Sequence, residues 1–142
     1  MKNRIWKSAI LVSILMAICI FAIQPQTVQS QGKVGIARMW EGRTSVAKAD
    51  AYERYLEENG IPGLKSAAGN LGVQILRRNN PTAVEFIVIS YWESRDAIKK
   101  MVGEDIERAY SLPRDPEFLL EPVTTVRHYQ VTYTSTAKLG SM

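Results

Sequence analysis

The chain has 142 residues, of which 46% are hydrophobic, with 18 Lys and Arg against 14 Asp and Glu. This length suits one ordinary domain with a packed core, and the hydrophobic fraction is too low for a polytopic membrane protein. Three of the basic residues precede residue 30 and every acidic residue follows it, so the rest of the chain has 15 basic against 14 acidic residues. A net charge of about +1 predicts no broad basic surface, so no nucleic-acid partner is expected.

The first 30 residues have the layout of an export signal. Lys2, Arg4 and Lys7 precede an apolar run from Ala9 to Ile23. Such a run spans about 22 Å as a helix, less than the roughly 30 Å hydrocarbon core of a membrane. We therefore expect residues 1–30 to be a cleaved signal peptide, with an uncleaved membrane anchor as the alternative. Either way the domain lies outside the cytoplasm, periplasmic or secreted, and only this segment could link it to the membrane.

Metal and cofactor chemistry has little support in the sequence. The single cysteine, Cys19, lies inside the apolar run, so the expected mature domain can form neither a disulfide nor a cysteine metal site. Glu104, Asp105 and Glu107 form an acidic cluster without a histidine at ligand spacing. The chain also lacks a glycine-rich phosphate loop after a strand. We therefore predict no metal site and no cofactor.

The first predicted elements after the signal are a strand and a helix. Residues 34–43 alternate between two partly covered faces, which is typical of a strand. Ser45 suits the N-cap of a helix whose apolar residues recur at helical spacing. The pair Asn59-Gly60 is expected to end this helix, and Pro62 to prevent its resumption.

A hairpin, a second helix and a last strand follow. Residues 72–78 and 84–92 indicate two strands joined by an Asn- and Pro-containing turn, and they should pair antiparallel. Ser94 is expected to cap a helix with one apolar face, which Gly103 breaks or bends. Residues 123–133 are expected to form the last strand.

The order strand, helix, strand, strand, helix, strand predicts an α+β ferredoxin-like fold, βαββαβ, with a four-stranded antiparallel sheet and both helices on one face. Apolar residues occupy both faces of the third strand, for example Phe86 on one and Ile87 on the other, so the sheet face without helices also needs cover. A second copy is the simplest cover, which predicts a homodimer forming an α+β barrel. The predicted domain covers residues 34–133, and residues 134–142 are expected to be a flexible tail.

With these elements placed, the chain resembles a known family. The segments IARMWEGRT, KADAYERYLEENGIPGL, GNLGVQILRR, EFIVISYWESRDAIKKMVGEDIERA and VRHYQV, in that order, are similar to antibiotic biosynthesis monooxygenase (ABM)-like domains of the dimeric α+β barrel group. The resemblance covers about residues 34–133 and implies both the fold and the dimer. Some members of that family oxidise polyketide-like phenols with dioxygen and no cofactor, and others degrade haem.

Haem degradation is disfavoured by the same resemblance. Haem-degrading members use an Asn on the first strand and a Trp and a His on the second helix. Laid over those elements, this chain has Met39, Met101 and Ser111. None of these can replace a haem-ligating imidazole, unless His128 does so from the last strand.

Four residues are candidates for a functional site. His128, the only histidine, is expected to titrate near neutrality and could act as the catalytic base for a phenolic proton; the alternative is a hydrogen-bonded structural role. Arg38 and Trp40 share a strand face and could bind a substrate that is an aromatic acid or phenolate, with a core Trp and a surface or interface Arg as the alternative. Trp92 is expected first to pack the following helix onto the sheet and second to line a substrate pocket.

Two functions remain open. The first is an exported, homodimeric monooxygenase-like oxidoreductase that binds or oxidises a small aromatic, phenolic or polyketide-like molecule with dioxygen alone. The alternative is a non-catalytic extracytoplasmic homodimer that binds a small ligand or serves in a stress response.

Overall fold

The computed structural model describes residues 35–134. The predicted export segment, residues 1–30, and nearly all of the predicted tail lie outside this part of the chain. Within residues 35–134, no helix is both long and apolar enough to cross a membrane.

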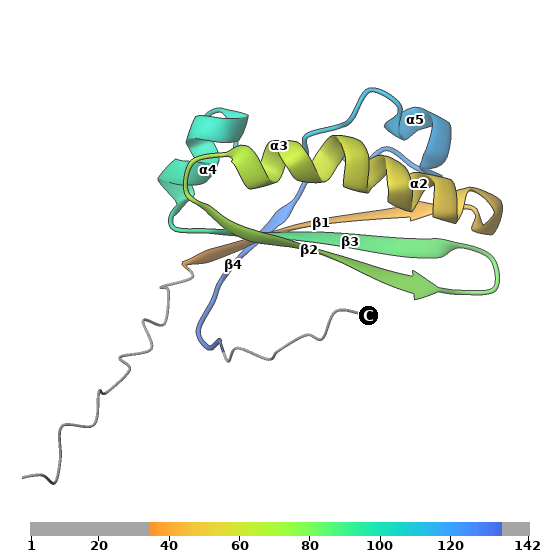
Figure 1. Ribbon diagram of the computed structural model, residues 1–142, viewed down its shortest axis with the longest axis horizontal. Helices are drawn as coiled ribbons and strands as arrows, with labels where there is room; N and C mark the ends of the chain where they lie inside the picture. Colours follow the sequence, from red (N-terminus) through yellow and green to blue (C-terminus); the bar gives the residue numbers. More distant parts are fainter. Residues whose placement is uncertain (1–34, 135–142) are drawn as a thin grey trace, which may run out of the picture. The chain divides into compact units, whose positions relative to one another are not determined.

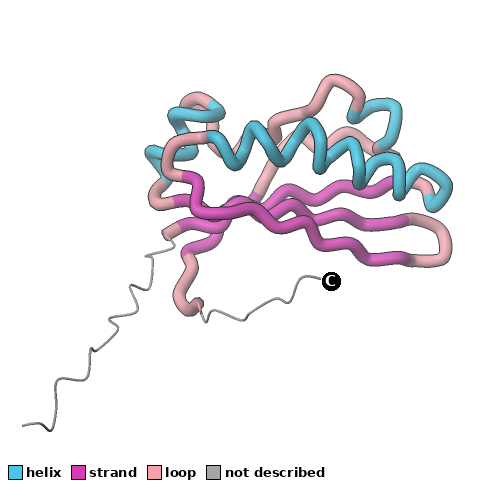
Figure 2. The backbone as a smooth tube through the Cα atoms, viewed as in Figure 1, coloured by secondary structure: helices cyan, strands magenta, loops and turns pink. Residues whose placement is uncertain are grey.

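The described residues form one antiparallel sheet with helices on one face (Figures 1 and 2). The strands follow the spatial order β2-β3-β1-β4, and every neighbouring pair is antiparallel. The strands are β1 (Ile36–Thr44), β2 (Asn70–Asn79), β3 (Val84–Trp92) and β4 (Arg127–Gln130). The helices are α2 (Ala49–Tyr55), α3 (Ile61–Ser66), α4 (Arg95–Val102) and α5 (Asp115–Phe118). The α+β ferredoxin-like prediction is therefore confirmed, although β4 is shorter than residues 123–133.

The predicted hairpin is confirmed. Strands β2 and β3 pair from Asn79 opposite Val84 to Asn70 opposite Trp92. The turn between them is closed by the Asn80 N–H, which donates to the Ala83 carbonyl at 3.0 Å. Strand β3 lies between β1 and β2, so both its edges are paired. Its apolar and β-branched residues suit this central position.

The predicted end of the first helix at Asn59-Gly60 is wrong. A π-helical turn, Leu56–Gly60, connects α2 directly to α3, and the Ile61 N–H donates to the Leu56 carbonyl five residues earlier. Pro62 then falls in the first turn of α3, where a missing backbone N–H costs little. The wider turn therefore lets the chain pass a proline that would interrupt a regular α-helix.

The second helix begins as predicted and ends early. The Ser94 side chain accepts a hydrogen bond from the Ala97 N–H at 3.2 Å, and Gly103 ends α4 with a φ of 92°. Residues after Gly103 continue as a loop, which the Ala109 N–H anchors by donating to the Thr124 carbonyl at 2.9 Å. By contrast Ser45, the other predicted cap, makes no side-chain capping bond and precedes only a short 3-10 turn.

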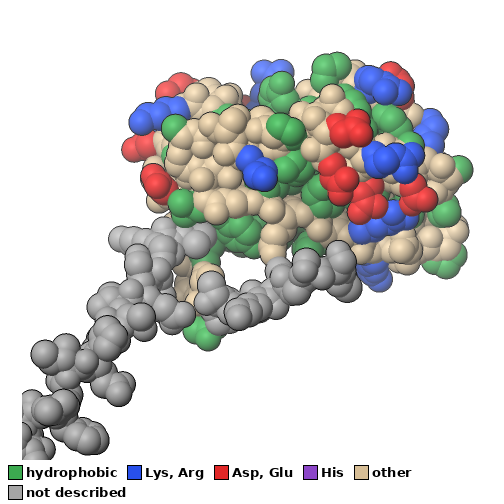
Figure 3. All heavy atoms as spheres, in the orientation of Figure 1, with side chains coloured by type: hydrophobic (Ala, Val, Ile, Leu, Met, Phe, Trp, Pro, Cys, Tyr) green, Lys and Arg blue, Asp and Glu red, His purple; other side chains and the backbone are tan. Residues whose placement is uncertain are grey.

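Alternation along the strands gives the sheet two different faces. The face under the helices contains the main core, in which Trp40, Phe86 and Val88 are buried. The opposite face has no covering element in the described chain, and Leu76 and Tyr129 are 46% and 47% exposed. On the face drawn in Figure 3, acidic and basic side chains intermingle without a broad patch of either sign.

Candidate functional site

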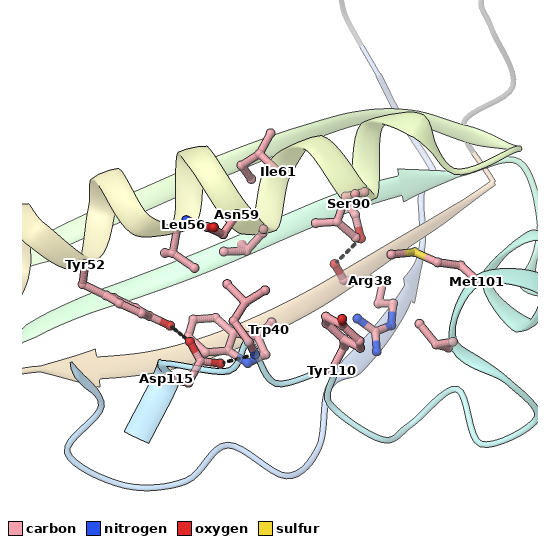
Figure 4. Close-up of a pocket in the computed structure, with 16 residues that line it drawn as sticks. Arg38, Trp40, Tyr52, Leu56, Asn59, Ile61, Ser90, Met101, Tyr110 and Asp115 are labelled. Carbon is pink, nitrogen blue, oxygen red and sulfur yellow. Dashed lines mark hydrogen bonds between the residues drawn. The ribbon is translucent and has the colours of Figure 1, made fainter. Parts of the chain in front are cut away.

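A cavity of about 160 Å³ lies between the helix-covered face of the sheet and the α2–α3 segment (Figure 4). Its floor comes from β1 and β3, and its roof includes the π-helical turn Leu56–Gly60. Helix α4 and the loop that follows it supply Met101 and Tyr110. Tyr110 is 64% exposed, so this end of the cavity meets the solvent. Most of the lining side chains are apolar or aromatic, which is typical of a small-molecule site.

Arg38 is a buried cation in the wall of this cavity. The residue is only 5% exposed, and its Nη2 donates to the Arg108 carbonyl at 2.8 Å. In the described part of the chain, its Nε has no hydrogen-bond partner and no carboxylate lies within salt-bridge distance of its guanidinium. Burial lowers the pKa of Arg38, and the nearby Glu107 charge opposes this shift. A buried charge without a close counter-ion is costly, so this wall favours an anionic ligand.

Trp40 forms the flat part of the cavity wall and follows Arg38 by two residues on the same face of β1. Its ring packs against Tyr52, with the ring centroids 6.4 Å apart. The indole also covers Gly42, where an added Cβ would collide with the Trp40 ring. A glycine at position 42 is therefore needed for the indole to lie along the strand. The arrangement provides an aromatic surface beside the Arg38 guanidinium.

Tyr52 and Asp115 form a buried polar pair at the end of the cavity away from Arg38 and Tyr110 (Figure 4). The Tyr52 hydroxyl donates to Asp115 Oδ1 at 3.1 Å, and the Leu112 N–H donates to Oδ2 at 2.8 Å. Burial raises the pKa of Asp115, and the two hydrogen bonds oppose that shift. Burial and the neighbouring Asp115 raise the pKa of Tyr52, so its hydroxyl stays protonated.

His128 lies beside the cavity and is not among its lining residues. It pairs with Arg38 in the β1–β4 register, and its side chain is 1% exposed. Its Nδ1 lies 3.1 Å from Glu107 Oε1, which leaves the buried Nε2 without a partner in the described chain. Burial lowers the pKa of His128, as does the charge of Arg38, while Glu107 raises it. His128 therefore has no direct contact with the cavity and lies next to Arg38, which lines it.

Trp92 also lies outside the cavity lining. It is fully buried, and its Nε1–H donates to Ser90 Oγ at 2.9 Å. Its ring belongs to a second core cluster with Ala97, Ile98 and Ile106, which joins α4 to the sheet. Of the four candidate residues, the structure therefore places Arg38 and Trp40 together in the cavity and His128 and Trp92 behind its wall.

Sequence reasoning missed two polar residues of the site. In the sequence, Tyr52 falls at an apolar position of the first helix, which predicts a core residue and not the hydroxyl that donates to Asp115. Asp115 lies between Pro113 and Pro116 in a segment without periodicity, so no pattern predicts its contact with Tyr52, 63 residues earlier in the chain. The only signal for Asp115 is a carboxylate set among prolines and apolar residues. Among the described residues, no three His, Cys, Asp or Glu side chains gather as a metal site requires.

A family model described as "Antibiotic biosynthesis monooxygenase" matches residues 40–110, half of the chain. The chain belongs to this family. The match confirms the resemblance of the sequence to ABM-like domains and includes the strand-to-helix corner at Trp92. Membership makes the chain a small-molecule-binding or monooxygenase-like domain.

Solved structures with the same fold come from Nitrosomonas europaea and Bacillus cereus. A candidate antibiotic biosynthesis monooxygenase from Nitrosomonas europaea is 17% identical with a TM-score of 0.54, covering 73% of this chain and 96% of its own. One from Bacillus cereus is 14% identical with a TM-score of 0.52, covering 72% and 97%. A protein of unknown function from N. europaea is 12% identical with a TM-score of 0.51, covering 75% and 98%. At these identities the ABM neighbours support the fold alone. A comparison with curated protein sequences finds no match.

Proposed function

We propose that this ABM-family protein binds a single-ring aromatic acid or phenolate in the Arg38 cavity and, where that ligand is a phenol or quinol, oxidises it as a monooxygenase. The observation that carries the proposal is Arg38, a buried guanidinium to which no carboxylate of residues 35–134 comes within salt-bridge distance, in an otherwise largely apolar cavity. An anionic group on the ligand would supply the missing counter-charge, and Trp40 would stack against the ring.

The size of the cavity narrows the ligand class. About 160 Å³ is close to the roughly 150 Å³ of an engineered protein cavity that binds benzene. Pockets for drug-sized molecules occupy about 300–1,000 Å³. A single ring therefore fits, and a multi-ring polyketide would require the walls to move apart.

Arg38 would also favour the chemistry. A nearby positive charge lowers the pKa of a bound phenol and so favours the electron-rich phenolate. With a quinol as substrate, the reaction needs no reactant other than dioxygen. One oxygen atom forms a new hydroxyl on the ring and the other leaves as water. The product is a hydroxyquinone. Both oxygen atoms and all four electrons are accounted for by the quinol and the dioxygen.

We further propose that the protein acts outside the cytoplasm as a homodimer. The layout of residues 1–30 supports export. The half-exposed apolar side chains of the open sheet face, Leu76 and Tyr129 among them, support pairing with a second copy. The cavity lies on the opposite, helix-covered face, so each subunit would contain a whole binding site.

The test is ligand binding and oxygen uptake by the purified full-length protein with benzoate, phenols and quinols. Arg38→Met should weaken benzoate binding about 10- to 100-fold, because a charged hydrogen bond is lost. The same change at the exposed Arg54 of α2 is the matched control and should leave binding unchanged.

The outcomes separate the candidate functions. Oxygen uptake with a quinol that falls with Arg38→Met supports the monooxygenase. Anion binding without oxygen uptake supports the alternative, a non-catalytic small-ligand-binding homodimer. Equal benzoate affinity in the Arg38→Met and unchanged proteins would contradict both, because Arg38 would then have no part in binding.

A further inference from the structure

The end of the cavity opposite Arg38 has its own polar chemistry. Asp115 is buried and lines the cavity, and each of its two carboxylate oxygens accepts one hydrogen bond, from Tyr52 and from Leu112. A carboxylate has about four lone-pair sites, so each oxygen can accept a further donor. Among the described residues, no cation lies within salt-bridge distance of Asp115.

The two polar ends are arranged along one strand face. Arg38 and Trp40 are two residues apart on β1, a step of about 6.6 Å, and Tyr52 packs on the Trp40 ring. Figure 4 shows Asp115 and Tyr52 at one end of the cavity and Arg38 toward the other. A single aromatic ring that lies along Trp40 therefore has a cation near one substituent and a carboxylate near the substituent across the ring.

We infer that the cavity selects a ring with a hydroxyl group para to its anionic group, which donates a hydrogen bond to Asp115. This inference rests on the proposed function, because it assigns the second end of the ligand bound by Arg38. The ligand class is a para-hydroxylated single-ring anion, such as a 4-hydroxybenzoate or a singly ionised 1,4-quinol. Asp115 is a specificity-determining residue on this account, and Tyr52 holds its carboxylate in place.

The binding of three probes to the unchanged full-length protein is the first test. 4-Hydroxybenzoate should bind about tenfold more tightly than benzoate, because one buried hydrogen bond is gained. 3-Hydroxybenzoate has the same groups in another geometry and should show little of this gain. Equal affinities for all three probes would overturn the inference and leave the proposed function intact, and failure of every probe to bind would overturn both.

Two variants then identify the acceptor. Asp115→Leu keeps roughly the size of the side chain and removes both acceptor oxygens, so the ratio of the affinities for 4-hydroxybenzoate and benzoate should fall from about ten to about one. Tyr52→Phe removes a donor from Asp115 and leaves its oxygens free, so this ratio should persist. A ratio that stays near ten in Asp115→Leu, or is lost only in Tyr52→Phe, would overturn the role of Asp115.

Discussion

At the residue scale, the cavity is defined by two buried charged groups that do not meet each other. Arg38 has a carbonyl as its hydrogen-bond partner, and Asp115 has a hydroxyl and a backbone N–H. A protein optimised only for stability would pair or remove such groups, because an isolated buried charge is unfavourable. Their separation across one cavity is the reason that we assign them to ligand binding.

His128 should make the stability of the fold depend on pH. Its pKa is lowered in the folded protein, so the folded state takes up this proton at a lower pH than the unfolded state does. The stabilisation is complete above the unfolded pKa of about 6.5 and is lost as the pH falls through the lower folded value. His128→Gln should therefore flatten the fall in unfolding free energy below pH 6.5, measured by urea denaturation.

The contribution of His128 is the difference between the unchanged protein and His128→Gln in how the unfolding free energy depends on pH. Glu107, Arg95 and Arg38 surround His128 and are present in both, and Asp115, whose pKa is raised, titrates in the opposite sense in both. An identical pH dependence for the unchanged protein and His128→Gln would show that this histidine does not contribute.

Trp92 should be a large stability determinant with no direct part in binding. Its side chain is fully buried between α4 and the sheet, so Trp92→Ala should cost about 3–5 kcal/mol of unfolding free energy. Val46→Ala, at a 53% exposed side chain on the 3-10 turn Val46–Lys48, is the control and should change stability by less than about 0.5 kcal/mol. A loss below about 1 kcal/mol for Trp92→Ala in urea denaturation would contradict the packing described.

At the element scale, the structure explains which predictions were possible. Strand β3 was located at its observed bounds because a continuous β-branched and aromatic run between turn residues has few other conformations. The joining of α2 and α3 could not be predicted, because Asn, Gly and Pro are each common where helices end. Only the tertiary packing of Leu56 and Leu64 on the sheet favours the π-helical turn over a break.

The residues of the site also divide into those that the sequence pattern predicts and those that it does not. The shared face of Arg38 and Trp40 was predictable from the period of a strand. Asp115 was not, because it lies in an irregular segment whose position depends on the isolated pairing of Thr44 with Leu119 and on the bonds of Leu112. Long-range contacts of this kind leave no local pattern in the sequence.

The two serines at predicted caps provide a matched test at this scale. Ser94 accepts a hydrogen bond from the Ala97 N–H, so Ser94→Ala should lower the unfolding free energy by about 1 kcal/mol. Ser45 makes no such bond, so Ser45→Ala should change it by a few tenths of a kcal/mol at most. Equal losses for the two variants in thermal or urea unfolding would show that the Ser94 bond has no net effect.

At the scale of the whole molecule, the binding cavity and the proposed dimer surface lie on opposite faces of one sheet. Ile89 on β3 points to the open face, while its neighbours Val88 and Ser90 line the cavity. The fold thus separates the cavity from the proposed contact between subunits. A monomer should therefore still bind ligand.

Ile89→Lys should separate dimer formation from ligand binding. A charge in the middle of the open face opposes pairing, so sedimentation should shift from dimer to monomer while the affinity for benzoate stays within about threefold. Ala51→Lys, on the exposed side of α2, is the control and should leave the dimer intact. A monomeric unchanged protein, or a loss of ligand binding with Ile89→Lys, would contradict this separation.

The alternation of β1 also has a consequence for how the sequence can vary. Ala37, Met39 and Glu41 face the open side of the sheet, where the proposed second copy would pack, and Arg38 and Trp40 line the cavity. Residues for two separate purposes therefore alternate along this strand. A substitution on the open face therefore leaves the cavity-facing residues unchanged, and the reverse also holds. Inserting or deleting one residue near the start of this strand would exchange the two faces, so that Arg38 would point to the open side and Met39 into the cavity.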